Sequence, residues 1–110
     1  MHTPEDVLRR LYLTLQARKS APPDQSYVAS LYAKGLDTIL KKLGEEAAET
    51  LIAAKNPDRD ALVYEMADLW FHSLVLLAAN DIPLEKLSEE LERRMGRSGH
   101  EEKASRKTPA

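Results

Sequence analysis

Apolar residues recur at intervals of three and four along most of the chain, which is the period of helices with one buried face. Apolar and polar residues do not alternate over any long stretch, so the pattern gives no support for strands. We therefore predict an all-α fold, a small helical bundle of about five helices. The first helix starts at Pro4 and stops at the Pro22-Pro23 pair, and the others span residues 26–34, 36–54, 61–79 and 83–95.

Three of these helices have an apolar stripe that we expect to face the core. In the first helix the stripe consists of Val7, Leu8, Leu11 and Leu15, and in the last it consists of Leu84, Leu87 and Leu91. The stripe of helix 36–54 contains Leu36, Ile39, Leu40, Leu43, Ala47, Leu51 and Ala54. We expect a single domain over residues 1–110, of which residues 96–110 form a polar tail.

Helix 61–79 is apolar over most of its surface but also contains acidic residues, which are costly to bury. Large apolar side chains cover nearly every direction around its axis, so most of its surface is expected to be buried. Glu65, Asp68 and His72 fall on one narrow strip of this helix, three and seven residues apart. The helix contains no Lys or Arg, and burying an unpaired carboxylate costs several kcal/mol. The compensating charge must therefore come from another part of the molecule.

The preceding helix carries a matching pair of acids. Glu46 and Glu49 lie one turn apart beside its apolar stripe, while Glu45 is turned further toward solvent. If the two helices pack antiparallel through the short turn between them, the carboxylates of Glu46, Glu49, Glu65 and Asp68 approach one another. A hard divalent cation such as Mg²⁺ or Mn²⁺ relieves this repulsion and keeps coordination positions for water and phosphate. The pattern thus predicts a metal site that serves a phosphate-bearing substrate.

The same acids also fit arrangements without a metal ion. Lys41 and Lys42 each precede a glutamate by four residues, so these pairs would also fit surface ion pairs. An arginine from another helix would equally neutralise the buried acids. For His72 we favour a supporting contact with Asp68, four residues earlier, over metal ligation. A di-iron carboxylate site is disfavoured, because Glu-x-x-His does not occur in the chain.

Composition narrows the possible functions. The 110 residues are 43% hydrophobic and 31% charged, which is typical of a folded soluble chain, and the net charge of −2 argues against nucleic-acid binding. The absence of cysteine excludes disulfides, thiol catalysis and Cys-based zinc sites. The longest apolar stretch, residues 74–79, is short for a membrane span, and residues 1–20 are too charged for a signal peptide. We expect a cytoplasmic protein that binds neither nucleic acid nor membrane.

The order of the acidic motifs resembles a known group of enzymes. Glu46-x-x-Glu49 followed by Glu65-x-x-Asp68 is similar to the metal-binding signature of the all-α nucleoside triphosphate pyrophosphatases, which include MazG-type enzymes and dimeric dUTPases. Within this group, four blocks in order resemble the phosphoribosyl-ATP pyrophosphatase family of histidine biosynthesis more closely. These blocks are residues 26–31 with Gly35, residues 42–49, residues 65–72 and residues 101–106.

The resemblance implies an activity and a set of ligands. It implies that the chain hydrolyses phosphoribosyl-ATP to phosphoribosyl-AMP and pyrophosphate, with Mg²⁺ held by Glu46, Glu49, Glu65 and Asp68. Glu45 and Glu49 are the candidates for activating the attacking water. The resemblance also implies a homodimer, and a short chain with a helix that is apolar on all sides agrees with a core completed by a second copy.

Several basic residues are candidates for binding the substrate. Lys42 lies beside the acids, and we expect it to contact phosphate. Further candidates, on the short second helix and in the polar tail, are Lys34, Arg97, Lys103 and Arg106. Two alternative functions remain open: a house-cleaning nucleoside triphosphate pyrophosphatase with the same metal site, and a helical interaction module without catalytic activity.

Overall fold

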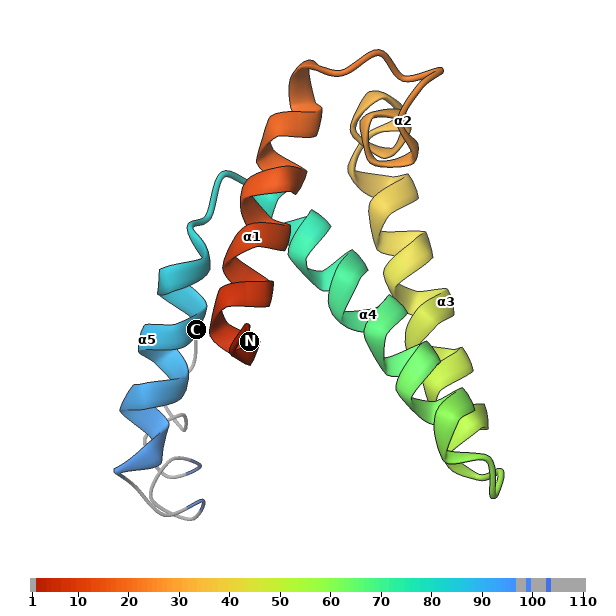
Figure 1. Cartoon of the computed structure of the whole chain (residues 1–110), viewed down its shortest axis with the longest axis vertical. Coiled ribbons are helices and arrows are strands. Elements are labelled where there is room, and N and C mark those ends of the chain that lie inside the picture. The colour runs from red at the N-terminus through yellow and green to blue at the C-terminus, as the bar shows by residue number, and fades with distance from the viewer. Residues whose placement is uncertain (1, 97–98, 100–102, 104–110) are drawn as a thin grey trace.

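The helical prediction is confirmed by the computed structural model, which describes residues 2–96, 99 and 103. Within these residues the chain forms helices and no strand. Its shape in Figure 1 is an arch: α1 and α5 form one leg, and the outer part of the α3–α4 hairpin forms the other. The elements are α1 (Pro4–Ala17), the 3₁₀ helix η1 (Arg18–Ser20), α2 (Tyr27–Lys34), α3 (Leu36–Ala54), α4 (Arg59–Ala79) and α5 (Leu84–Met95).

Polar residues at the helix starts explain where α1, α2 and α4 begin. The Thr3 side chain accepts a hydrogen bond from the backbone N–H of Asp6, and the Asp6 side chain accepts one from Thr3, which makes a capping box. Ser26 caps α2 in a similar way through the N–H of Ala29. Asp58 caps α4, so this helix starts two residues before the predicted position 61.

Gly35 is the single residue between α2 and α3. Its φ of 100° lies in a region that side chains with a Cβ atom rarely adopt, so a glycine is favoured at this joint. The chain therefore turns sharply, and α2 packs against the start of α3 at a steep angle to it (Figure 1).

The core lies where α1, α2, the start of α3 and the end of α4 meet. Its largest fully buried side chains are Leu15, Ile39 and Val75, one from each of three helices. Buried tyrosines add directional contacts, because the hydroxyl of Tyr12 donates to the carbonyl of Ile82 in the connection before α5. The remaining members of the buried cluster are Tyr12, Val28, Leu31, Leu74 and Ala78.

Some residues of the predicted apolar stripes are exposed in the single chain. The expectation that every stripe residue faces the core is therefore wrong for the exposed ones. The exposed members are Val7, Leu36, Leu40, Leu51, Ala54, Leu87 and Leu91. Helix periodicity identifies an apolar face, but it does not say which element covers that face. In α3 the side facing α4 instead contains the buried residues Ile39, Glu46, Thr50 and Ala53.

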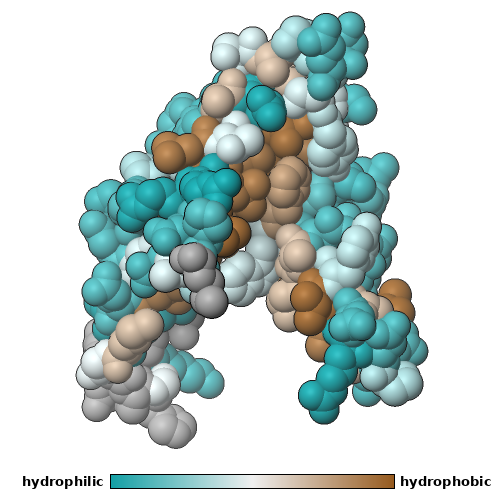
Figure 2. Space-filling view, viewed as in Figure 1, coloured by the Kyte–Doolittle hydropathy of each residue, from teal (hydrophilic) through white to brown (hydrophobic). Residues whose placement is uncertain are grey.

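An exposed apolar region lies on the outer half of the α3–α4 hairpin. We call it the hairpin surface, and Figure 2 shows hydrophobic atoms at this end of the arch. Helix α4 is therefore not covered on most sides within one chain, contrary to prediction. The hairpin surface consists of Leu51 and Ile52 of α3 and of Val63, Tyr64, Met66 and Trp70 of α4.

Helix α4 is also long and apolar enough to cross a membrane, by length and composition alone. Core helices pass the same test, so this finding is weak evidence for a membrane span. Two carboxylates, Glu65 and Asp68, lie within this helix, and charges inside a bilayer are costly.

The packing of α1 predicts different effects for two of its leucines. Leu15 is 1% exposed and Leu13 is 60% exposed. We expect Leu15→Ala to lower the free energy of unfolding by about 3 kcal/mol, because it leaves a cavity between α1, α2 and α4. The matched control Leu13→Ala should cost less than about 1 kcal/mol. Urea unfolding at one fixed protein concentration measures both, and equal losses would contradict this description of the core.

Candidate metal and phosphate site

Three carboxylates from α3 and α4 come together halfway along the hairpin. Glu46 and Glu49 lie one turn apart on α3, and Glu65 lies opposite them on α4. One carboxylate oxygen from each residue lies within 4.8 Å of the others. We call these three residues the carboxylate cluster. The convergence predicted from the two acidic motifs is confirmed for this trio.

The side-chain hydroxyl of Thr50 links the two helices at this level. The hydroxyl of Thr50 lies 2.8 Å from the carbonyl oxygen of Glu46 and 3.2 Å from that of Glu65. Thr50 is buried and donates its proton between these two carbonyls. This link joins the α3 turn that carries Glu46 to the α4 turn that carries Glu65.

The cluster contains buried oxygen atoms without partners. Glu46 is only 6% exposed, although it is a charged residue. Within the described part of the chain, Oε2 of Glu46 and Oε2 of Glu65 are buried and have no hydrogen-bond partner. Buried carboxylate oxygens normally accept hydrogen bonds or bind a metal ion. The donor set of hard oxygen atoms therefore fits a cation such as Mg²⁺.

Mutual repulsion and burial change the proton affinity of the cluster. Burial raises the pKa of Glu46, and the charges of Glu49 and Asp68 raise it further. The pKa of Glu65 is raised chiefly because its carboxyl group can share a hydrogen-bonded proton with Glu49, and next because of burial. Both shifts mean that negative charge at the cluster is unfavourable without a cation.

Asp68 lies close to the cluster but outside the trio. Its charge raises the pKa of both Glu46 and Glu65, as expected for a carboxylate one turn from Glu65 on the same helix face. His72 is buried, and its Nδ1 lies 2.8 Å from the backbone carbonyl oxygen of Asp68. The expected support of Asp68 by His72 is thus made to the backbone of Asp68.

Lys42 forms ion pairs with two acids of its own helix, α3. Its Nζ lies 3.4 Å from Oε2 of Glu45 and 3.9 Å from Oε1 of Glu46. Glu45 is exposed and faces Lys42, outside the trio of close carboxylates. The alternative of a surface ion pair therefore describes Glu45, whereas the acid of Glu46 is buried.

Among the residues that the structure describes, no ion pair joins Lys34 or Lys103 to the carboxylate cluster. Lys34 is exposed in the last turn of α2, and Lys103 is exposed as well. Arg97 and Arg106 lie outside the described residues.

Sequence reasoning did not single out Tyr27 as a site residue. Its hydroxyl lies 2.9 Å from Nε2 of His72. Burial raises the pKa of Tyr27, and the charges of Glu46 and Asp68 raise it further, while Lys42 acts in the opposite direction. The available signal was its position in the motif block 26–31, because its helical pattern alone does not distinguish it from a core tyrosine.

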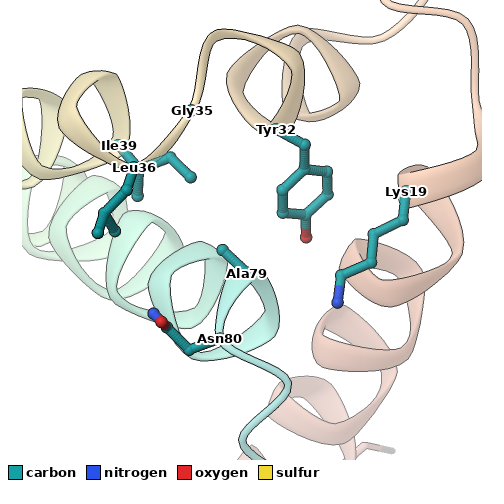
Figure 3. A pocket seen from close by; sticks show the side chains of 7 residues that line it. All are labelled: Lys19, Tyr32, Gly35, Leu36, Ile39, Ala79 and Asn80. Atoms are coloured by element: carbon teal, nitrogen blue, oxygen red, sulfur yellow. The ribbon is translucent and has the colours of Figure 1, made fainter.

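A separate cavity of about 350 Å³ opens near the other end of the hairpin (Figure 3). None of the residues predicted for the site is among the described residues that line it. The lining residues are Lys19, Tyr32, Gly35, Leu36, Ile39, Ala79 and Asn80.

The raised pKa of Glu46 predicts how stability depends on pH in the metal-free protein. Its stabilising contribution is fully present below the unfolded pKa of 4.5 and is lost as pH rises through the folded pKa. The stability of wild type relative to Glu46→Gln should therefore fall as pH rises above 4.5. Thermal unfolding in a chelator at a series of pH values measures this difference.

Glu90 gives a control of opposite sign. Hydrogen bonds from Arg93 and Arg94 lower its pKa to about 2, so its contribution is present above pH 4.5 and is lost on acidification. The stability of wild type relative to Glu90→Gln should rise with pH over this range. The same trend in both comparisons would contradict the assignment of Glu46 as a buried, unpaired acid.

Comparison with known proteins identifies the family of this chain. A family model described as phosphoribosyl-ATP pyrophosphohydrolase matches residues 8–95. A protein named phosphoribosyl-ATP pyrophosphatase from Methylococcus capsulatus is 63% identical over 102 residues, which cover 93% of this chain and 97% of that protein. Proteins of the same name are 55% identical in Hydrogenovibrio crunogenus, over 92% of this chain and 93% of theirs, and 53% identical in Nitrosomonas eutropha, over 96% and 91%. The chain therefore belongs to the phosphoribosyl-ATP pyrophosphohydrolase family.

Proposed function

We propose that this protein hydrolyses phosphoribosyl-ATP to phosphoribosyl-AMP and pyrophosphate, the second step of histidine biosynthesis. Family membership over most of the chain supports the substrate. The observation that carries the proposal is the carboxylate cluster with its two unpartnered buried oxygens, because such a site suits a cation that binds a triphosphate.

The cation we propose is Mg²⁺, held by Glu46, Glu49 and Glu65 with Asp68 as a further ligand. The close approach of three carboxylates and the raised pKa values of Glu46 and Glu65 support a bound cation at this place. When bound, Mg²⁺ neutralises the charge that develops on the phosphates during their hydrolysis. The hard oxygen ligands favour Mg²⁺ or Mn²⁺ over softer metals.

We assign the activation of water and the binding of phosphate to side chains in and around the cluster. In the reaction the oxygen of a water molecule bonds to phosphorus, the anhydride between the first and second phosphates breaks, and pyrophosphate leaves with the electron pair. Glu49, the most exposed member of the cluster, would orient this water and accept its proton, and Glu45 is the second candidate. Lys42 would contact the phosphates, because it is ion-paired beside the cluster.

The outer parts of the substrate need additional cations. We propose Lys34, Arg97, Lys103 and Arg106 for these contacts, because a substrate with phosphates at both ends extends beyond Lys42. This function also makes the cytoplasm the expected compartment. The net charge of −2 agrees with a small-molecule substrate instead of nucleic acid.

The hairpin surface supports a homodimer. Leu51 is 71% exposed and Trp70 is 53% exposed, which is unusual for large apolar residues that lie in one region. A second copy that presents its own apolar face would cover these side chains, as two-fold interfaces do. We therefore propose that two chains pair through the outer half of the α3–α4 hairpin and that this pairing completes the core.

The proposed reaction predicts which carboxylates activity requires. We expect Glu49→Gln and Asp68→Asn to lower kcat/KM for phosphoribosyl-ATP by at least about a hundredfold, because each weakens cation binding where charge develops. Glu89→Gln on the exposed face of α5 removes the same charge elsewhere and should leave activity unchanged. A pyrophosphate-release assay with saturating Mg²⁺ measures all four proteins.

The same assay decides between the candidate functions. Faster release from common nucleoside triphosphates than from phosphoribosyl-ATP would favour the house-cleaning enzyme. No release from any nucleotide, together with no rise in melting temperature on Mg²⁺ addition, would favour the interaction module. Wild-type rates in Asp68→Asn would remove Asp68 from the ligand set.

The proposed dimer predicts the effect of a charge at the hairpin surface. Leu51→Asp should convert a particle with twice the mass of one chain into a monomer, because the interface would bury an unpaired carboxylate. The control Leu13→Asp places the same charge on an exposed position of α1 and should leave the dimer intact. Light scattering after size-exclusion chromatography measures the mass, and a dimer that survives Leu51→Asp would place the interface elsewhere.

A further inference from the structure

The cavity beside the first turn of α3 has the size of a small-molecule site (Figure 3). Its volume of about 350 Å³ lies within the range of about 300–1,000 Å³ that is typical of ligand pockets. Leu36, Ile39 and Ala79 form an apolar wall, and Lys19 and Asn80 bring polar groups to the same space. We call it the Lys19 cavity. Leu36 is half-exposed, so the cavity opens to solvent.

Lys19 is held in place at this cavity by two neighbours. Its Nζ lies 2.6 Å from Oδ1 of Asp81 and 5.9 Å from the centre of the Tyr32 ring. The Tyr32 hydroxyl donates to the carbonyl of Leu15 at 2.8 Å, which fixes that ring. Asp81 uses one of the three N–H donors of Lys19, and within the described residues no other acceptor is hydrogen-bonded to it. Two donors therefore remain for an anion.

The ion pair of Lys19 with Asp81 does not close the cavity to an anion. The Asp81 side chain is 81% exposed, whereas that of Lys19 is 32% exposed. Ion pairs with such an exposed partner contribute little to stability. A phosphate group carries up to two negative charges, so it competes well with a single solvated carboxylate for Lys19.

The start of α3 adds positive potential to the same space. Gly35 and Leu36 line the cavity, and Gly35, which precedes the helix, makes no side-chain hydrogen bond to its first turn. The first turn of a helix carries a partial positive charge, because its backbone N–H groups point outward along the helix axis. This charge supplements that of Lys19, so the cavity favours an anionic ligand.

The Lys19 cavity and the carboxylate cluster lie along one strip of α3. Ile39 at the cavity and Glu46 in the cluster are seven residues apart, which is two helical turns and about 10 Å along the axis. Both side chains are buried on the side of α3 that faces α4. A molecule with an adenine ring between two sugar phosphates spans a separation of this size.

We propose that the Lys19 cavity binds the second ribose phosphate of the substrate and that Lys19 is the cation that recognises it. This inference rests on the proposed function, because it names the site for the end of phosphoribosyl-ATP that lies away from the triphosphate. The apolar wall packs against the sugar. The Asn80 amide already donates to the carbonyl of Leu76, and its oxygen is the acceptor for a sugar hydroxyl. ATP lacks this second sugar phosphate, so the cavity determines specificity.

The direct test is a titration of the metal-free protein with ribose 5-phosphate, followed by the NMR signals of its backbone amides. The signals of Leu36 and Asp37 should shift in a saturable way, because these amides lie at the cavity. The signal of Glu49 should not shift, because the metal-free cluster repels anions. Ribose without phosphate should cause no saturable shift.

Variants of the ion pair separate phosphate binding from structural support. Lys19→Met should weaken ribose 5-phosphate binding about tenfold or more, because the cation is lost. Asp81→Asn breaks the same ion pair but keeps Lys19, so affinity should hold or rise. Asn also tolerates the positive φ of 56° at this position. Lys55→Met at the other end of α3 should leave affinity unchanged, and melting temperatures show that each variant is folded.

The kinetic test compares two nucleotides. Lys19→Met should raise KM for phosphoribosyl-ATP about tenfold with little change in kcat, because the contact is remote from the bond that breaks. The same variant should leave the kinetics with ATP unchanged. Ribose 5-phosphate should inhibit the wild-type enzyme competitively with phosphoribosyl-ATP.

Several results would overturn the assignment. Equal losses of affinity in Lys19→Met and Asp81→Asn would reduce the ion pair to a structural contact. The absence of a saturable shift at Leu36 and Asp37 would remove the sugar phosphate from the cavity, and noncompetitive inhibition would make the ligand a separate effector instead of part of the substrate. Binding that depends on Lys19, in a protein that does not hydrolyse phosphoribosyl-ATP, would refute the proposed function and leave the cavity as a sugar-phosphate site.

Discussion

The close packing of two acidic helix turns is the constraint on which the rest of this structure depends. Thr50 links the backbones of Glu46 and Glu65, so the turns that carry these two acids stay close together. The resulting repulsion and burial raise the pKa of both acids. The apolar core at the other end of the hairpin, built around Ile39 and Val75, supplies stabilisation that offsets this cost. The molecule thus separates the part that stabilises it from the part that carries its chemistry.

At the proposed active site, acidic oxygens are buried between the helices and a basic side chain lies nearer the surface. The unpartnered oxygens of Glu46 and Glu65 are buried between the helices, where a small cation is well shielded from solvent. Lys42 lies further out, where it forms an ion pair with the exposed Glu45. An anhydride with several phosphates needs positive charge on more than one side. This gradient from buried acids to a basic rim provides it without placing a lysine in the cluster.

The hairpin surface connects the proposed assembly to the proposed chemistry. Tyr64 and Met66 flank Glu65 in the sequence, and both are exposed in the single chain. A second chain that covers them would lie against the same helical turn of α4 that carries Glu65. Exclusion of water from this side would strengthen every electrostatic interaction of the cluster. Pairing of two chains would therefore act on both stability and the site.

The sequence by itself determined the helices, because caps such as Ser26 and Asp58 and the joint at Gly35 act through neighbouring residues. It also determined that the acids of α3 and α4 meet, since a short turn forces consecutive helices to pack antiparallel. Only the tertiary structure decided that Glu46 is buried whereas Glu45 faces Lys42, and that the hydroxyl of Tyr27 reaches His72. It likewise decided which members of the apolar stripes are covered. The physical reason is that periodicity fixes the direction of a side chain around its own helix, while its surroundings depend on how separate helices pack.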